Sequence, residues 1–190
     1  MILSDIFDIK RGINNNRDLS ENEKDNLINL KNEYKLKTHN KLYHFNNKSI
    51  IFLPNVNKVI NKNNALKNND IIMNIANHDI YLYQGDDDYY FFNQNFYIIR
   101  LKEEYKNEEI IFTIFTMLEK IVNKAMMNNA SIPRLDISIV KNYKIPEFNE
   151  LKKYNKIIKN IFELQVLLKE KNKLEEEVLT NKMNSLMKGV

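Results

Sequence analysis

The C-terminal segment of the chain, residues 149–188, places the strongest constraint on the fold. It contains neither proline nor glycine, and its leucines, isoleucines and valines recur at helical spacings between lysines and glutamates. A helix of this length extends about 55–60 Å at ~1.5 Å per residue, which is longer than a small domain is wide. The sequence therefore predicts that region 149–190 is one long helix that projects from the protein or finds a partner.

The long helix has an apolar stripe, which Lys171 interrupts. On an isolated helix such a stripe leaves apolar surface that only a partner can cover. A two-fold homodimer is the commonest closed arrangement, and its helices can run parallel or antiparallel. The alternative is a helix that packs back against its own domain. The predicted dimer-interface residues are Ile157, Ile161, Leu164, Leu168, Leu174 and Val178.

The preceding residues, 1–148, have the composition of one folded domain. Hydrophobic residues make up 43% of the chain, close to the globular average, so a core can form. Strand-like runs bounded by turn residues lie at 2–12, 41–53 and 65–102, and an apolar stripe predicts a helix over 107–127. We predict an α+β fold with a twisted mixed or antiparallel sheet and helices, followed by the long C-terminal coiled-coil helix.

The segment ASIPRLDISIVKNYKIPEF, residues 130–148, joins the two parts. Pro133 and Pro146 disfavour the α conformation in the residues before them. Between the prolines, LDISIV alternates apolar and polar residues, so we predict a strand there that completes the sheet. Pro146 then lets the chain turn sharply into the long helix.

Several classes of chemistry have no counterpart in the sequence. The chain has no cysteine, no glycine-rich phosphate loop and no G-x-S-x-G motif. Its histidines, His39, His44 and His78, lack the H-E-x-x-H spacing of zinc sites. We therefore expect a protein that is not an enzyme and that needs neither a metal nor a cofactor.

The N-terminus predicts a protein that stays in the cytoplasm. Asp5 and Asp8 lie inside its apolar stretch, and no small-residue cleavage site follows, so it does not resemble a secretory signal. No apolar run reaches the roughly 18 residues that span a bilayer, so we expect no membrane association.

The charge of the chain permits nucleic-acid binding without requiring it. The net charge is +4, and lysine supplies nearly all of the positive charge. Arginine occurs only at Arg11, Arg17, Arg100 and Arg134. These residues are informative because arginine can pair bidentately with guanine or phosphate, whereas lysine cannot.

Four short motifs follow one another in a characteristic order. LSDIFDIKRG at 3–12 is similar to L-x-D-I-x-x-I-x-x-G, and NNDIIMNI contains a D-I-L/I strand at 70–72. NQNFYIIR at 93–100 is similar to N-Q-x-F-x-x-I/L-R, and I-P steps follow at 132–133 and 145–146, before the long helix. In this order the chain resembles the target-recognition domain of Type I restriction–modification specificity subunits. It has one such domain and one long helix, so it resembles half of a specificity subunit.

The resemblance implies a function and a set of partners. It implies sequence-specific recognition of double-stranded DNA, dimerisation through the helix, and recruitment of a separate adenine methyltransferase subunit. A translocating restriction subunit is an additional partner that the sequence leaves open. Together with the sequence it suggests DNA contacts at Lys10, Arg11, Asn14, Asn15, Asn16, Arg17, Lys41, His44, Asn74, Asn77, His78, Gln94, Arg134 and Lys141.

Two other functions are compatible with the same sequence. One is a coiled-coil interaction protein that does not bind nucleic acid. The other is a decoy that occupies the methyltransferase without supporting modification. Salt-dependent binding to duplex DNA separates the first from a recognition subunit, and reconstituted methylation separates the second.

Overall fold

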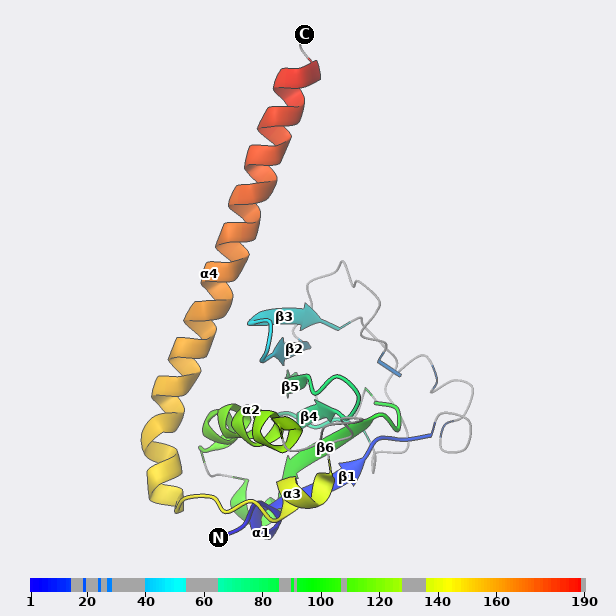
Figure 1. Ribbon diagram of the computed structural model, residues 1–190, viewed down its shortest axis with the longest axis vertical. Coiled ribbons are helices and arrows are strands. Elements are labelled where there is room, and N and C mark those ends of the chain that lie inside the picture. Colours follow the sequence, from blue (N-terminus) through cyan, green and yellow to red (C-terminus); the bar gives the residue numbers. More distant parts are fainter. Residues whose placement is uncertain are drawn as a thin grey trace.

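The computed structural model describes residues 1–14, 19, 24, 27–28, 40–53, 65–85, 90, 92–106, 109–127 and 136–188. These residues form an antiparallel six-stranded sheet, several helices and one long C-terminal helix (Figure 1). The elements are α1 (Leu3–Ile6), β1 (Phe7–Arg11), β2 (Lys41–His44), β3 (Ser49–Phe52), β4 (Ile71–Asn74), β5 (Ile80–Gln84), β6 (Phe96–Leu101), η2 (Glu103–Tyr105), α2 (Ile111–Met127), α3 (Ile137–Lys141) and α4 (Phe148–Lys188).

The strands lie in the order β1-β6-β4-β5-β2-β3, and every pairing between neighbours is antiparallel. Short turns join β2 to β3 and β4 to β5, whereas β1 pairs with β6 from far along the chain. The α+β class, the antiparallel sheet and the long helix that the sequence predicts are therefore confirmed.

Both faces of the central strands β4, β5 and β6 are largely buried, which explains why their sequences read as nearly continuous apolar runs. On one face, Ile71, Leu82 and Ile99 belong to a cluster that includes the buried residues of α2. On the other, Ile72 and Tyr83 pack against residues outside the strands. That second cluster includes Leu53, Leu66, Tyr90 and Phe92. Helices thus cover one face, and segments that connect the strands cover the other.

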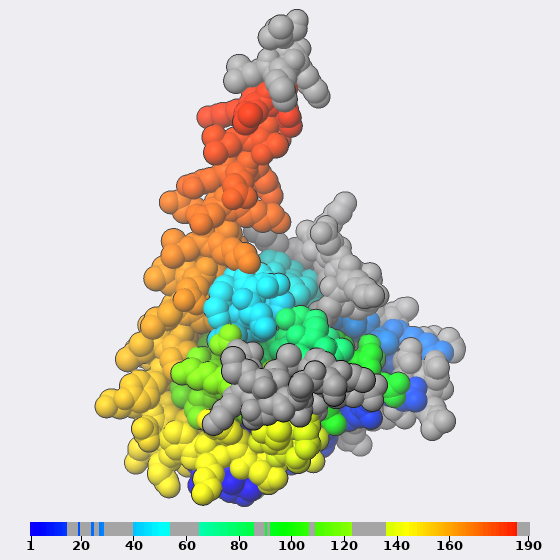
Figure 2. Space-filling model, viewed as in Figure 1, coloured from blue at the N-terminus to red at the C-terminus, as the bar shows by residue number. Residues whose placement is uncertain are grey.

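Helix α4 packs across α2 and then continues past the domain (Figure 1). Its contact with the domain includes Leu151, Phe162 and Val166, all of them buried. At the upper limit of this contact, the Lys169 ammonium donates to the Asn47 carbonyl in the β2–β3 turn. Beyond this point the helix rises as a column above the domain in the space-filling view (Figure 2).

Two short segments differ from the predicted secondary structure. Leu3–Ile6 forms a helical turn rather than the start of a strand, and the Asp5 carboxylate accepts from the Ile2 N–H at 2.8 Å. Ile137–Lys141 forms helix α3 rather than a strand, so the prediction for LDISIV is wrong. The Asp136 carboxylate accepts from the Ser138 N–H at 2.9 Å, and this local cap stabilises a helical turn that alternation alone does not predict. The same hydrogen bond lowers the pKa of Asp136.

Within the described part of the chain, no helix combines the length and the apolarity that crossing a membrane requires.

Candidate nucleic-acid interface

Many of the predicted DNA-contacting residues lie at one end of the sheet, which we call the hairpin end. The hairpin end consists of the last residue of β1 (Arg11), turn 92–95, turn 74–79 and the last residue of β2 (His44). The strand register places these segments together, since Arg11 pairs with Tyr97, Asn74 with Phe96, and His44 with Tyr81. Antiparallel pairing therefore gathers residues that are up to 83 positions apart in sequence.

Hydrogen bonds tie the segments of the hairpin end to one another. The Arg11 Nε donates to the Gln94 carbonyl at 2.7 Å. The Ile75 N–H donates to the Asn95 carbonyl at 3.0 Å, so turns 74–79 and 92–95 are joined. Within the first turn, Asn74 Oδ1 accepts from the Ala76 N–H at 2.9 Å. The surface is therefore held in a defined shape by backbone and side-chain bonds.

Asp79 is the centre of the polar contacts beneath this surface. Its Oδ2 atom accepts from the Asn77 amide at 2.6 Å and from the Tyr81 hydroxyl at 3.2 Å. Its Oδ1 atom lies 3.1 Å from His44 Nε2. That contact is an ion-pair distance rather than an aligned hydrogen bond, because His44 Nε2 is buried without a hydrogen-bond partner. The carboxylate thus orients an exposed amide while it contacts two buried rings.

Tyr81 packs against the other two members of this polar group, His44 and Asp79. Its ring stacks on His44 with centroids 4.5 Å apart. Burial raises the pKa of the Tyr81 hydroxyl well above its usual range, and the Asp79 charge adds to this effect. The hydroxyl therefore remains protonated and continues to donate to Asp79 across the ordinary pH range.

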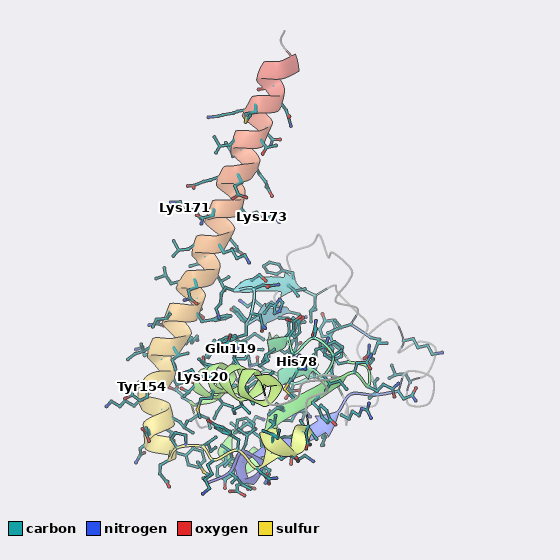
Figure 3. All side chains as sticks on the ribbon, in the orientation of Figure 1. His78, Glu119, Lys120, Tyr154, Lys171 and Lys173 are labelled. Atoms are coloured by element: carbon teal, nitrogen blue, oxygen red, sulfur yellow. The ribbon has the colours of Figure 1, made fainter. Side chains whose placement is uncertain are left out.

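The predicted residues divide into two groups according to their place in the fold. At or beside the hairpin end, Lys10, Arg11, Asn77 and Gln94 are exposed, Asn14 and Asn74 are half-buried, and His44 and His78 are buried. His78 adopts φ 63° within turn 74–79 (Figure 3). The histidines therefore help to shape the turn, while the arginine and the amides provide the accessible surface.

The remaining predicted residues lie elsewhere or outside the described part of the chain. Lys41 lies at the opposite end of β2, where it pairs with Gln84 and Phe52. Lys141 lies on α3, close to the bridge between Ile2 and Lys144, just before the start of β1 and so at the opposite end of the sheet from Arg11. Asn15, Asn16, Arg17 and Arg134 fall outside the described residues.

Residues of the three N-terminal motifs contact one another. A Cβ at Gly12 would lie 2.1 Å from the Asn93 carbonyl oxygen, so this position requires glycine beside the NQNF turn. Asp70 and Arg100 form a bidentate pair, with N–O distances of 2.8 and 2.6 Å, and Asp70 is 1% exposed. Arg100 also donates to the Ala65 carbonyl at 2.7 Å. Arg100, which is not among the predicted DNA contacts, is therefore an internal structural residue.

Asp79 is a candidate functional residue that the sequence does not predict. A surface that approaches phosphate favours cations over carboxylates, and no periodic pattern marks Asp79. The available signal is its position, between turn residues Asn77-His78 and the buried strand β5. A charged residue at the edge of a buried strand needs partners, and here those partners are the predicted contact residues.

The predicted dimer-interface residues form an exposed surface on α4, which we call the outer face. Tyr154 and Lys171 point away from the domain, whereas Lys173 lies on the domain side (Figure 3). All members of the predicted set are 51–61% exposed: Ile157, Ile161, Leu164, Leu168, Leu174 and Val178. Helix α4 therefore packs on its own domain and also leaves its predicted stripe uncovered, so the two alternatives for this helix are not exclusive.

Among the described residues, no group of three or more histidine, cysteine or acidic side chains could hold a metal ion. In comparisons with known protein families and with curated proteins, the sequence has no match. The functional argument therefore rests on this chain's own residues and geometry.

Proposed function

We propose that this protein is a sequence-specific DNA-recognition subunit of a restriction–modification system of the Type I kind, without catalytic activity of its own. The observation that carries the proposal is the hairpin end, where residues from separate motifs form one hydrogen-bonded surface. Arg11, Asn77 and Gln94 are exposed there, and arginine and amide side chains are the residues that pair with guanine and adenine edges. Lys10 adds a cation suited to phosphate.

The outer face of α4 supports the assembly part of the proposal. Its apolar residues need a partner, and a second copy of the chain would use the same face twice. The two recognition domains of the dimer would then read two half-sites. In the Type I specificity subunits that the motifs resemble, one chain carries both domains. Methylation would depend on a separate adenine methyltransferase subunit, and cleavage on a further partner.

The first experiment measures binding of the full chain to randomised duplex DNA. We expect binding that weakens as salt increases, because contacts to phosphate release condensed counterions. Sequencing of the retained duplexes should return a motif. A flat affinity across salt concentrations, or retained duplexes without any common motif, would contradict the proposal. Self-association without DNA binding would instead favour the coiled-coil interaction protein.

A matched pair of substitutions locates the surface. Arg11→Ala and Lys141→Ala each remove one exposed cation, but only Arg11 lies at the hairpin end. We expect Arg11→Ala to weaken binding to the selected sequence about tenfold and Lys141→Ala to leave it within about twofold, since a good bidentate base contact is worth ~1–3 kcal/mol. Equal effects of the two changes would place the interface elsewhere. Methylation of the selected duplex by a reconstituted catalytic subunit then distinguishes a working subunit from a decoy.

A further inference from the structure

Asn155 on α4 caps a different helix. Its side-chain Oδ1 accepts from the Phe112 N–H at 2.9 Å and from the Thr113 N–H at 3.2 Å. These amides belong to the first turn of α2, where backbone N–H groups have no partner within their own helix. Asn155 is only 8% exposed, so the bonds form away from water. An N-cap normally comes from the residue that precedes a helix, whereas this one comes from 42 or 43 positions along the chain.

A second hydrogen bond runs between the same two helices. The Thr113 hydroxyl donates to the Leu151 carbonyl at 2.9 Å, one turn before Asn155 on α4. We call these contacts, together with the two that Asn155 accepts, the Asn155 lock. Hydrophobic packing between helices leaves a scatter of about 15–20° in their crossing angle, and hydrogen bonds with defined donors and acceptors narrow that range.

We infer that Asn155 is a positioning residue whose lock sets the direction in which α4 leaves the domain. This inference rests on the proposed function for its consequence: in a dimer, the direction of α4 determines the spacing of the two DNA sequences that are read. About 19 residues of α4 lie beyond Lys169, where its contact with the domain ends, which is a lever of ~28 Å at ~1.5 Å per residue. A tilt of about 10° would move its end by ~5 Å, which is between one and two base-pair steps of ~3.4 Å.

The first test compares spacer preference. The full-length wild type is used to select duplexes from a randomised library, which defines two half-sites and the spacer between them. Binding is then measured to duplexes whose spacer is shortened or lengthened by one base pair. We expect the wild type to discriminate about tenfold and Asn155→Ala to discriminate less than about threefold. Asn155→Asp should retain the wild-type preference, because a carboxylate accepts the same two N–H groups and ranks with asparagine as a cap.

The second test reads the direction of α4 without DNA. Spin labels are attached to two introduced cysteines, Glu104→Cys and Glu177→Cys, both at exposed positions. Because the chain has no cysteine of its own, no other site is labelled. Labelled chains are diluted with unlabelled chains so that distances within one molecule dominate. We expect a narrow distance distribution in the wild type and in Asn155→Asp, and a broad or shifted one in Asn155→Ala.

Thr113→Val removes the second hydrogen bond without changing side-chain shape. If Asn155→Ala does not fold, Thr113→Val takes its place in both the spacer and the distance measurements. A wild-type distance distribution in every folded lock variant would overturn the inference. So would a wild-type spacer preference in those variants, and in that case the proposed function would stand. If the wild type binds no duplex, the proposed function fails, and the distance measurement still decides whether the lock directs α4.

Discussion

The two faces of α4 differ in composition and in partner. On the inner face, toward the domain, Leu151, Asn155, Phe162 and Val166 are at most 8% exposed, and they combine a polar residue and an aromatic ring with aliphatic side chains. On the outer face, residues 154, 157, 161, 164 and 168 alternate in steps of three and four, the spacing of a coiled coil, and are 44–57% exposed. Both faces therefore have helical spacing, and they differ in which side chains occupy it and in whether the domain covers them.

This difference shows what each face has to match. The inner face contacts α2 and β3, so its residues fit different neighbours along the helix, and they include the polar residue that bonds to α2. A partner helix presents the same repeat along its length, so the outer face can be uniformly apolar from 154 to 168. Helical spacing alone thus does not distinguish the two faces, whereas the identity of the side chains does.

The largest expected difference between the faces is in stability. Phe162 lies in a ring cluster, with centroids 5.6 Å from Phe115, 5.8 Å from Tyr43 and 5.9 Å from Phe45. Phe162→Ala should lower the free energy of unfolding by about 3–5 kcal/mol, because it removes a buried ring and leaves a cavity. Leu164→Ala on the outer face should change it by no more than ~0.5 kcal/mol when the protein is dilute enough to be monomeric. Urea unfolding measures both values, and similar losses would show that the outer face is covered within the monomer.

The next effect concerns self-association. Leu164→Lys combined with Leu168→Lys places two charges on the outer face and should weaken association at least a hundredfold, since burying unpaired like charges is unfavourable. The circular dichroism of the dilute protein should stay unchanged, because neither side chain contacts the domain core. Sedimentation across a concentration series measures association. A wild-type protein that remains monomeric at high concentration would remove the basis for the dimer.

A smaller effect should come from the break in the repeat. We call the repeat of outer-face positions in steps of three and four the seam, and Lys171 occupies its next position after Leu168. The Lys171 ammonium lies 3.5 Å from the Glu175 carboxylate. Lys171→Leu should extend the seam by one apolar layer and tighten association about tenfold, equivalent to ~1.4 kcal/mol. Glu177→Leu adds the same side chain away from the seam and serves as the control. If both changes strengthen self-association equally, the effect is non-specific hydrophobic association and not packing at the seam.

The smallest expected effect is a pH dependence at the border of the inner face. The Lys48 ammonium lies 3.3 Å from the centroid of the Phe45 ring and 5.5 Å from that of Phe162. Burial lowers the pKa of Lys48 below 10.5, although the charge of Glu119 opposes this. The unfolded chain therefore binds more protons than the folded one between the two pKa values, so this residue should make stability rise with pH up to 10.5.

Lys48→Met keeps the apolar stem and removes the charge, so the difference in unfolding free energy between wild type and variant should change with alkaline pH. The corresponding change at Lys173, which is exposed, should leave the pH dependence as it is in the wild type. A constant difference between wild type and Lys48→Met would show that Lys48 is fully hydrated.

The strands and the long helices were predictable because their signals are local. Apolar runs such as Ile71-Ile72-Met73 end at turn residues, and Ile114, Leu118 and Ile121 share one buried face of α2, with Ile110 buried just before the helix. The short helix α3 was not predictable from alternation, because a single cap at Asp136 decides it. In so short a segment, one hydrogen bond outweighs the two-residue period.

The candidate site was predictable only in part, since residue type identifies a possible DNA contact but not its surroundings. Arg11 and Gln94 were both expected as contacts, yet their mutual hydrogen bond follows from the pairing of β1 with β6. Arg100 was equally conspicuous in sequence but is bound to Asp70. The lock at Asn155 joins helices that are adjacent only in the folded chain, so no sequence window contains it.

The meeting of the two ends of the domain affects how the chain can fold during synthesis. The Leu3 N–H donates to the Tyr143 carbonyl, and the Ile145 N–H donates to the Met1 carbonyl, at 2.9 and 3.0 Å. Residues 1–6 therefore cannot form all of their hydrogen bonds until residue 145 has been synthesised. At ~5–20 residues per second, the synthesis of the residues in between takes roughly 7–30 s. During that interval Leu3, Ile6 and Phe7 are open to association with other nascent chains. Asp5 and Asp8 interrupt this apolar stretch, and charges placed in this way oppose aggregation of a segment that is not yet packed.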